Sequence, residues 1–162
     1  MASNDDTCAF ASIAANRDSV GRREFANGNA VDVKADAART GGSFALIEGT
    51  HQPETGPPLH IHDDVDEALY VLEGEYSIVA GDEVFNASEG DFVFLPRGLA
   101  HRFVCTSAGR MLLLYVPGGF EGYFAERARE EAASSGVLSA SQLDAIGRRY
   151  GMRLAGGPQS TP

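Results

Sequence analysis

The sequence predicts a mostly β protein with a single domain, and three observations support this. The chain has 162 residues, a length that suits one domain and is short for two. Its 19 glycines and seven prolines interrupt the chain every few residues, which argues against a long helical bundle. From residue 43 to 116, short segments rich in Val, Phe and Tyr alternate with turn residues, which is typical of a β-sandwich or barrel.

The elements are predicted in order along the chain. Residues 1–22 are mostly small and polar and are predicted to form a flexible arm, and the barrel is predicted to span residues 23–117. Phe25, Val31 and Val33 fit one or two edge strands. The remaining strand segments are residues 43–48, 68–73, 75–80, 83–86, 91–95, 101–106 and 110–116.

After Pro117 the apolar period changes from two to three or four, which predicts a helical extension over residues 118–155. Phe120 and Phe124 share one face of a first helix, which either caps a barrel mouth or packs on the outer sheet. A second helix is predicted from residue 141 to about 150. Residues 156–162 are predicted to be a disordered tail.

The charge of the chain excludes several classes of partner. Thirteen Lys and Arg stand against 23 Asp and Glu, for a net charge of −10, which argues against a nucleic-acid surface and against anionic lipid. No apolar run approaches the roughly 20 residues of a membrane-spanning helix. The N-terminus carries acids where a secretory signal carries Lys or Arg, so a cytoplasmic location is expected. The two cysteines, Cys8 and Cys105, match no disulfide framework or zinc pattern.

The histidines carry the strongest chemical signal. His60 and His62 are two residues apart, so on a strand both point to the same face. Glu67 can return on the next strand to face them, and His101 comes from a later hairpin. Three imidazoles and one carboxylate suit a divalent transition metal and leave one or two coordination positions open for chemistry. The remaining histidine, His51, is expected to be a structural residue and not a ligand.

These residues resemble the two motifs of the cupin superfamily. The strand pattern from residue 43 to 116 agrees with the resemblance, and two positions depart from it, Glu54 for Gly and Cys105 for Asn. Asp66 could replace Glu67 as the carboxylate ligand, but the six-residue interval to the motif glycine favours Glu67. The first motif is matched by His60, His62, Glu67 and Gly74, and the second by Gly90, Pro96, Gly98 and His101.

The resemblance implies an all-β fold, a single jelly-roll barrel with C-terminal helices packed on it. It also implies one divalent metal ion per chain (Fe, Mn, Co, Ni, Cu or Zn) on His60, His62, Glu67 and His101. Within the superfamily, segments 57–62, 67–74 and 117–124 are similar to bacterial monocupins of the quercetin 2,3-dioxygenase-like type. That similarity implies a dioxygenase in which Glu67 also takes the substrate proton, and small cupins of this kind imply a homodimer, for which residues 23–33 offer an edge strand.

The apolar strand residues imply a cavity for an aromatic, flavonol-like or polyketide-like small molecule. A deep anionic site would need inward Arg or Lys, and in the strand region only Arg102 and Arg110 are present, both expected to face solvent. Two other functions stay open: a metal-dependent cyclase or isomerase, and a non-catalytic small-molecule binder. The residues predicted to line the barrel or fill its core are Phe44, Leu46, Tyr70, Leu72, Tyr76, Ile78, Phe92, Phe94, Phe103 and Leu113.

Overall fold

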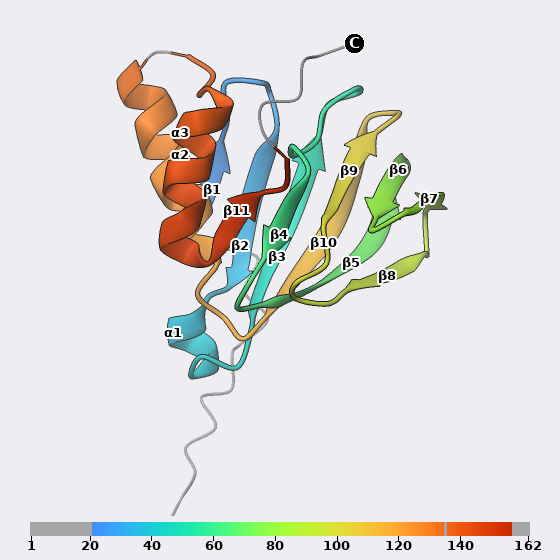
Figure 1. Cartoon of the computed structure of the whole chain (residues 1–162), viewed down its shortest axis with the longest axis horizontal. Coiled ribbons are helices and arrows are strands. Elements are labelled where there is room, and N and C mark those ends of the chain that lie inside the picture. The colour runs from blue at the N-terminus through green and yellow to red at the C-terminus, as the bar shows by residue number, and fades with distance from the viewer. Residues whose placement is uncertain (1–20, 135, 157–162) are drawn as a thin grey trace, which may run out of the picture.

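The computed structural model describes residues 21–134 and 136–156 and consists mainly of two antiparallel sheets (Figure 1). The all-β prediction is confirmed. From edge to edge, the six-stranded sheet contains β1 (Gly21–Glu24), β2 (Ala30–Ala35), β3 (Ala45–His51), β10 (Gly109–Val116), β5 (Asp66–Glu73) and β8 (Phe92–Leu95). The five-stranded sheet contains β11 (Met152–Leu154), β4 (His60–His62), β9 (His101–Cys105), β6 (Glu75–Ala80) and β7 (Glu83–Ser88).

Strict alternation along the strands sets which side chains fill the interior. In β5, Glu67, Leu69 and Val71 face inward and are at most 3% exposed. The core therefore lies between the two sheets, with the carboxylate of Glu67 embedded in it. Four of the residues predicted to be interior are buried there: Tyr76, Ile78, Phe103 and Leu113.

The prediction was wrong for four aromatic residues, which lie on the outside of the six-stranded sheet. Phe44 is 36% exposed, Tyr70 42%, Phe92 65% and Phe94 57%. In β5 the reason is the side-chain period of two, because an inward Glu67 requires an outward Tyr70. Phe92 pairs with Tyr70 across the β5–β8 ladder and shares its outward direction. The two remaining residues of the set, Leu46 and Leu72, are half-buried.

Two glycines are required where backbones approach closely. A Cβ at Gly56 would collide with the carbonyl oxygen of Phe103, so no larger residue fits between the β3–β4 connection and β9. Gly74 joins β5 to β6 with a φ of 87°, and its Cβ would lie 2.7 Å from the carbonyl oxygen of Ala108. The motif glycine therefore serves the tight turn that returns the chain from one sheet to the other.

The C-terminal segment covers one side of the barrel. Helices α2 (Glu121–Ser134) and α3 (Ala140–Gly147) lie beside β1, β2 and β11, away from β7 and β8 (Figure 1). A short 3₁₀ turn (Arg148–Tyr150) leads into β11, which pairs with β4. This strand, absent from the predicted helical extension, sits directly beside the two histidines of β4. The remaining helix, α1 (Ala37–Thr40), is a single turn capped by Asp36.

Several predictions fall on residues outside the described ranges. These include Cys8, the arm except for its last two residues, and the tail from residue 157 onward. Gly21 and Arg22 of the predicted arm belong to β1. Among the helices of residues 21–134 and 136–156, none is long and apolar enough to cross a bilayer.

Candidate metal centre

The four residues predicted to bind metal converge between the sheets from three strands. His60 and His62 come from β4, Glu67 from β5 and His101 from β9, where His101 pairs with His60. Their exposed fractions are 5%, 1%, 3% and 2%, in that order. One nitrogen of each ring and one carboxylate oxygen all lie within 4.8 Å of one another. The structure thus brings together the complete predicted set.

Backbone carbonyls fix how two of the rings are protonated. His60 Nδ1 lies 2.9 Å from the carbonyl oxygen of Pro58, and His101 Nδ1 lies 2.9 Å from that of Leu99. Because a carbonyl oxygen only accepts, each Nδ1 must carry the hydrogen, which leaves each Nε2 to face the centre. This is the usual arrangement of metal-binding histidines, whose second nitrogen is held by a backbone or carboxylate acceptor.

The third ring, that of His62, has no hydrogen-bond partner among the described residues. Both of its nitrogens are buried and unpaired, and its Nε2 lies 3.4 Å from Glu67 Oε2. A buried polar atom without a partner is costly, so native proteins rarely keep one without a purpose. A metal ion at the centre would supply the missing partner.

Glu67 is held as a carboxylate by the groups around it. Burial raises the pKa of Glu67, but the neighbouring imidazoles of His101 and His62 outweigh it and leave the pKa below its usual range. Oε2 lies 3.0 Å from His101 Nε2, and Oε1 accepts a hydrogen bond from the Tyr115 hydroxyl at 3.0 Å. Burial, reinforced by Glu67, raises the pKa of Tyr115 well above its usual value, so this hydroxyl keeps its proton.

The other carboxylate considered from the sequence, Asp66, lies outside the centre. It faces the opposite side of β5, where Arg97 donates to both of its oxygens at 2.9–3.0 Å. Hydrogen bonds from Arg97 lower the pKa of Asp66 to about 2. The alternation of β5 therefore selects Glu67 over its neighbour.

The donor set fits a divalent transition metal. Three imidazole nitrogens and one carboxylate oxygen suit Fe, Mn, Co, Ni, Cu or Zn, and carboxylate-poor sets of this kind disfavour Mg and Ca. Burial and the neighbouring His101 and His62 lower the pKa of His60 to about 3, so this ring is neutral and ready to donate its lone pair at pH 7. His60, His62, Glu67 and His101 could hold such an ion.

Removal of the Tyr115 hydroxyl is expected to weaken the centre without abolishing it. Tyr115→Phe leaves Glu67 Oε1 buried with one partner fewer, so metal affinity is expected to fall about tenfold, as for other residues that orient ligands. Titration of the metal-free protein with zinc measures the effect. An unchanged zinc affinity would show that Tyr115 does not orient Glu67.

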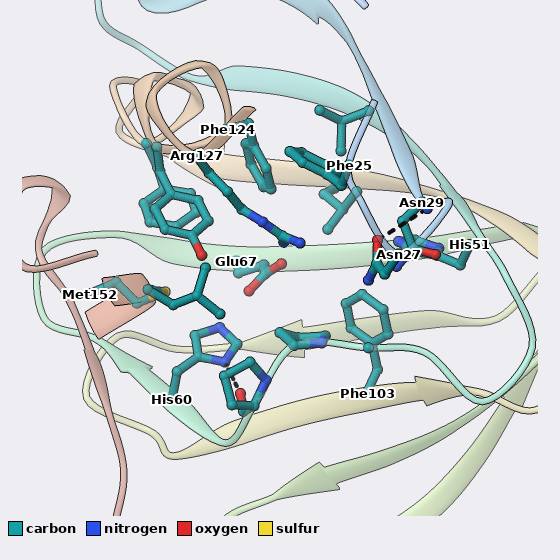
Figure 2. Close-up of a pocket in the computed structure, with 18 of the residues that line it drawn as sticks. Phe25, Asn27, Asn29, His51, His60, Glu67, Phe103, Phe124, Arg127 and Met152 are labelled. Atoms are coloured by element: carbon teal, nitrogen blue, oxygen red, sulfur yellow. Dashed lines mark hydrogen bonds between the residues drawn. The ribbon is translucent and has the colours of Figure 1, made fainter. Parts of the chain in front are cut away.

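A cavity of about 110 Å³ opens beside the centre and is walled mainly by apolar residues, and six of its lining residues are Phe or Tyr. His60 and Glu67 reach its wall from the barrel, and Tyr123, Phe124 and Arg127 reach it from α2 (Figure 2). Helix α2 therefore caps the barrel mouth. This is one of the two placements that the sequence left open, the other being packing on the outer sheet. Arg127 was not predicted from the sequence as a cavity residue, because inward cations were expected only on the strands.

His51 lines this cavity but does not belong to the candidate metal group. Its Nδ1 lies 3.1 Å from the Tyr76 hydroxyl. Its ring folds back over Gly49, where a Cβ would lie 2.6 Å from the ring carbon Cε1. Burial lowers the pKa of His51 to about 4, so the ring is neutral at pH 7.

Acid is expected to destabilise the metal-free protein partly through His51. The unfolded chain protonates His51 near pH 6.5 and the folded chain only near pH 4, so its contribution is lost as pH falls between these values. From pH 7 to pH 5 this one group should lower the free energy of unfolding by about 2 kcal/mol. Urea unfolding of wild type and of His51→Gln at both pH values measures this drop in the free energy of unfolding. An equal drop in both proteins would contradict the prediction.

Comparisons with known proteins agree with this geometry. Residues 48–117, which include all four residues of the centre, match the family model for the cupin domain. Quercetin 2,3-dioxygenase of Bacillus subtilis (strain 168) is 26% identical over 103 residues, which are 64% of this chain and 31% of that protein. The chain thus spans about a third of the length of this curated relative.

Solved structures share the fold at lower identity. KdgF from Halomonas sp. is 16% identical with a TM-score of 0.57, covering 63% of this chain and 92% of that chain. An RmlC-like cupin from Shewanella frigidimarina NCIMB 400 is 17% identical with a TM-score of 0.55, covering 60% and 84%. Residues 48–117 of this chain are therefore a cupin domain, and the solved structures share its fold.

Proposed function

We propose that this cupin is a metal-dependent dioxygenase that acts on an aromatic, flavonol-like or polyketide-like small molecule. The observation that carries the proposal is a buried group of three histidines and one glutamate beside a mainly apolar cavity with six Phe and Tyr residues in its wall. The similarity to a bacterial quercetin 2,3-dioxygenase supports the choice of reaction.

The protein residues have distinct parts in the proposed reaction. A divalent ion on His60, His62, Glu67 and His101 supplies Lewis acidity toward a substrate oxygen. Glu67 stands at the cavity wall and accepts the proton of an enol or phenol substrate. Tyr115 keeps Oε1 of Glu67 in place, and the apolar walls exclude water and oppose the charge on the carboxylate.

The size of the cavity limits the enclosed part of the substrate. An apolar cavity of roughly 150 Å³ accommodates a benzene molecule, so a cavity of about 110 Å³ encloses at most a single ring. A three-ring flavonol would have to leave part of itself at the mouth beneath α2 or displace that helix. Single-ring phenols and short enols therefore come before flavonols as test substrates.

Oxygen consumption tests the proposed reaction. Metal-free protein is reloaded with each of Fe, Mn, Co, Ni, Cu and Zn and assayed with quercetin and with single-ring phenols and enols. We expect substrate-dependent O₂ uptake with at least one redox-active metal and none for zinc. Conversion of substrate without O₂ uptake would favour a cyclase or isomerase, and binding without conversion would favour a non-catalytic binder.

We also propose a homodimer, formed through the outer face of β5 and β8. The edge strand β1 carries mostly charged residues, whereas Phe92 and Phe94 of β8 are 65% and 57% exposed beside Tyr70. Exposed apolar patches of this kind mark interfaces. Light scattering at micromolar concentration should give twice the chain mass for wild type and the chain mass for Phe94→Glu. A monomeric wild type would refute the dimer.

A further inference from the structure

Away from the candidate metal centre, the cavity is also lined by the polar side chains of Asn27, Asn29 and Arg127. In Figure 2, the two asparagines lie beside His51 on the opposite side of the cavity from His60. The asparagines belong to the β1–β2 connection, and Arg127 comes from α2. The Arg127 guanidinium lies over the ring of Phe25, two residues before Asn27, so α2 and the β1–β2 connection both contribute to this part of the cavity.

Arg127 is held so that at least two of its five N–H donors remain available to the cavity. Its Nε donates to Glu131 Oε1 at 2.8 Å, and the other oxygen of Glu131 accepts from the Ala26 amide at 2.6 Å. The guanidinium lies 4.2 Å from the ring centroid of Phe25 and beside Tyr123, where it opposes the effect of burial in raising the pKa of Tyr123. An arginine has five N–H donors. One donor of Arg127 goes to Glu131, and the Tyr123 hydroxyl can accept at most two more, so at least two remain for a ligand.

The two asparagines present donors as well. Asn27 Oδ1 accepts from the Asn29 backbone amide at 3.2 Å, and Asn29 Oδ1 accepts from the Gln52 amide at 2.9 Å and from Thr55 Oγ1 at 2.8 Å. Since a backbone N–H can only donate, these bonds fix which side-chain atom is oxygen. The acceptor of each amide is occupied, and each Nδ2 remains to donate.

The donors of Arg127 that Glu131 does not take suit an anionic ligand group. The side chain of Arg127 is only 16% exposed, and among the described residues that line the cavity it is the one Arg or Lys. A largely buried guanidinium is best satisfied by a planar carboxylate, which accepts two parallel hydrogen bonds from its fork.

We propose that this part of the cavity binds the carboxylate of a small acid through Arg127, assisted by the side-chain amides of Asn27 and Asn29. This inference rests on the proposed function, in which the opposite end of the same molecule presents its phenol or enol oxygen to Glu67 and the histidines. Given the volume of about 110 Å³, the ligand class is a single-ring or short-chain hydroxylated acid.

A pair of probes that differ only in charge tests this inference. The probes are 3-(4-hydroxyphenyl)propanoate and its neutral amide, titrated calorimetrically into protein loaded with zinc so that turnover is absent. We expect wild type to bind the acid about tenfold more tightly than the amide, because a charge-assisted pair replaces a neutral one. Equal binding of the two probes by wild type, or binding of neither, would overturn the inference.

Two variants and a control assign the preference to this site. Arg127→Gln removes the charge, and Asn27→Asp keeps the acceptor for the Asn29 amide while placing a carboxylate where the ligand acid would lie. Asn27→Asp leaves the Arg127–Glu131 pair intact, so it remains informative if Arg127→Gln does not fold. Both should reduce the acid-to-amide preference to below about twofold. Arg129→Gln, on the exposed side of α2, should leave it unchanged.

The result is independent of the proposed reaction. A preference that is lost in Arg127→Gln and Asn27→Asp supports the inference even if no substrate consumes O₂, in which case the dioxygenase proposal alone fails. A preference unchanged in both variants refutes the role of this part of the cavity even if O₂ is consumed.

Discussion

Replacing His62 with alanine is expected to remove most of the metal from the purified protein. His62 is 1% exposed, and neither of its nitrogens has a hydrogen-bond partner among the described residues, so an ion at the centre would satisfy one of them. Residues that merely orient ligands cost 10- to 100-fold in affinity when replaced, so loss of a ligand should exceed about 100-fold. Elemental analysis and zinc titration measure the change.

A matched control separates loss of a ligand from loss of a buried histidine. His51 is also buried in the barrel and lines the same cavity, but it lies outside the metal group. His51→Gln should therefore retain wild-type metal content. If His62→Ala carries as much metal as wild type, His62 is not a ligand and the assignment of the centre is wrong.

Replacing Glu67 with glutamine is expected to keep much of the metal and to lose most of the turnover. Three histidines remain, and the amide oxygen can still accept from Tyr115. The amide cannot take up a proton, and general-base groups contribute about 10²–10⁴-fold, so kcat should fall at least about 100-fold. The test is kcat and metal content measured on the same preparation, with whichever substrate wild type converts.

The adjacent carboxylate provides the control. Asp66→Asn likewise replaces a carboxylate with an amide, one residue before Glu67. Asp66 lies on the outer face of β5, where it pairs with Arg97. Its turnover should stay within about twofold of wild type, since exposed ion pairs contribute little. Normal turnover by metal-loaded Glu67→Gln would exclude Glu67 as the base and favour a Lewis-acid cyclase or a binding protein.

The sequence was sufficient to predict the fold and the four residues of the centre. His60 and His62 are spaced to share a face, and the interval to Glu67 allows the chain to turn and return on the next strand. Such short-range spacings survive folding because strand alternation is local. The metal-binding role of these residues is still a prediction.

The same alternation could have corrected the predicted core. Once Glu67 is assigned to the interior, Leu69 and Val71 must follow it inward and Tyr70 must face outward. The prediction instead favoured the large aromatic residues by hydrophobicity. An exposed Phe92 or Phe94 follows only from pairing with β5, a contact between distant segments that no local pattern contains.

The part of the cavity away from the metal centre depends on tertiary contacts throughout. Arg127 lies seven residues after Phe120 and three after Phe124, so helical spacing alone could have placed it on their face. Nothing local shows that this face caps the barrel mouth. The link from Glu131 to the Ala26 amide joins residues 105 positions apart, and only the folded chain reveals it.

The most direct test of the metal centre is anomalous diffraction from crystals grown with the ion that the protein retains on purification. One anomalous peak per chain is expected, within bonding distance of a ring nitrogen of His60, His62 and His101 and of a carboxylate oxygen of Glu67. A metal peak elsewhere on the chain, with no density among these four residues, would contradict it.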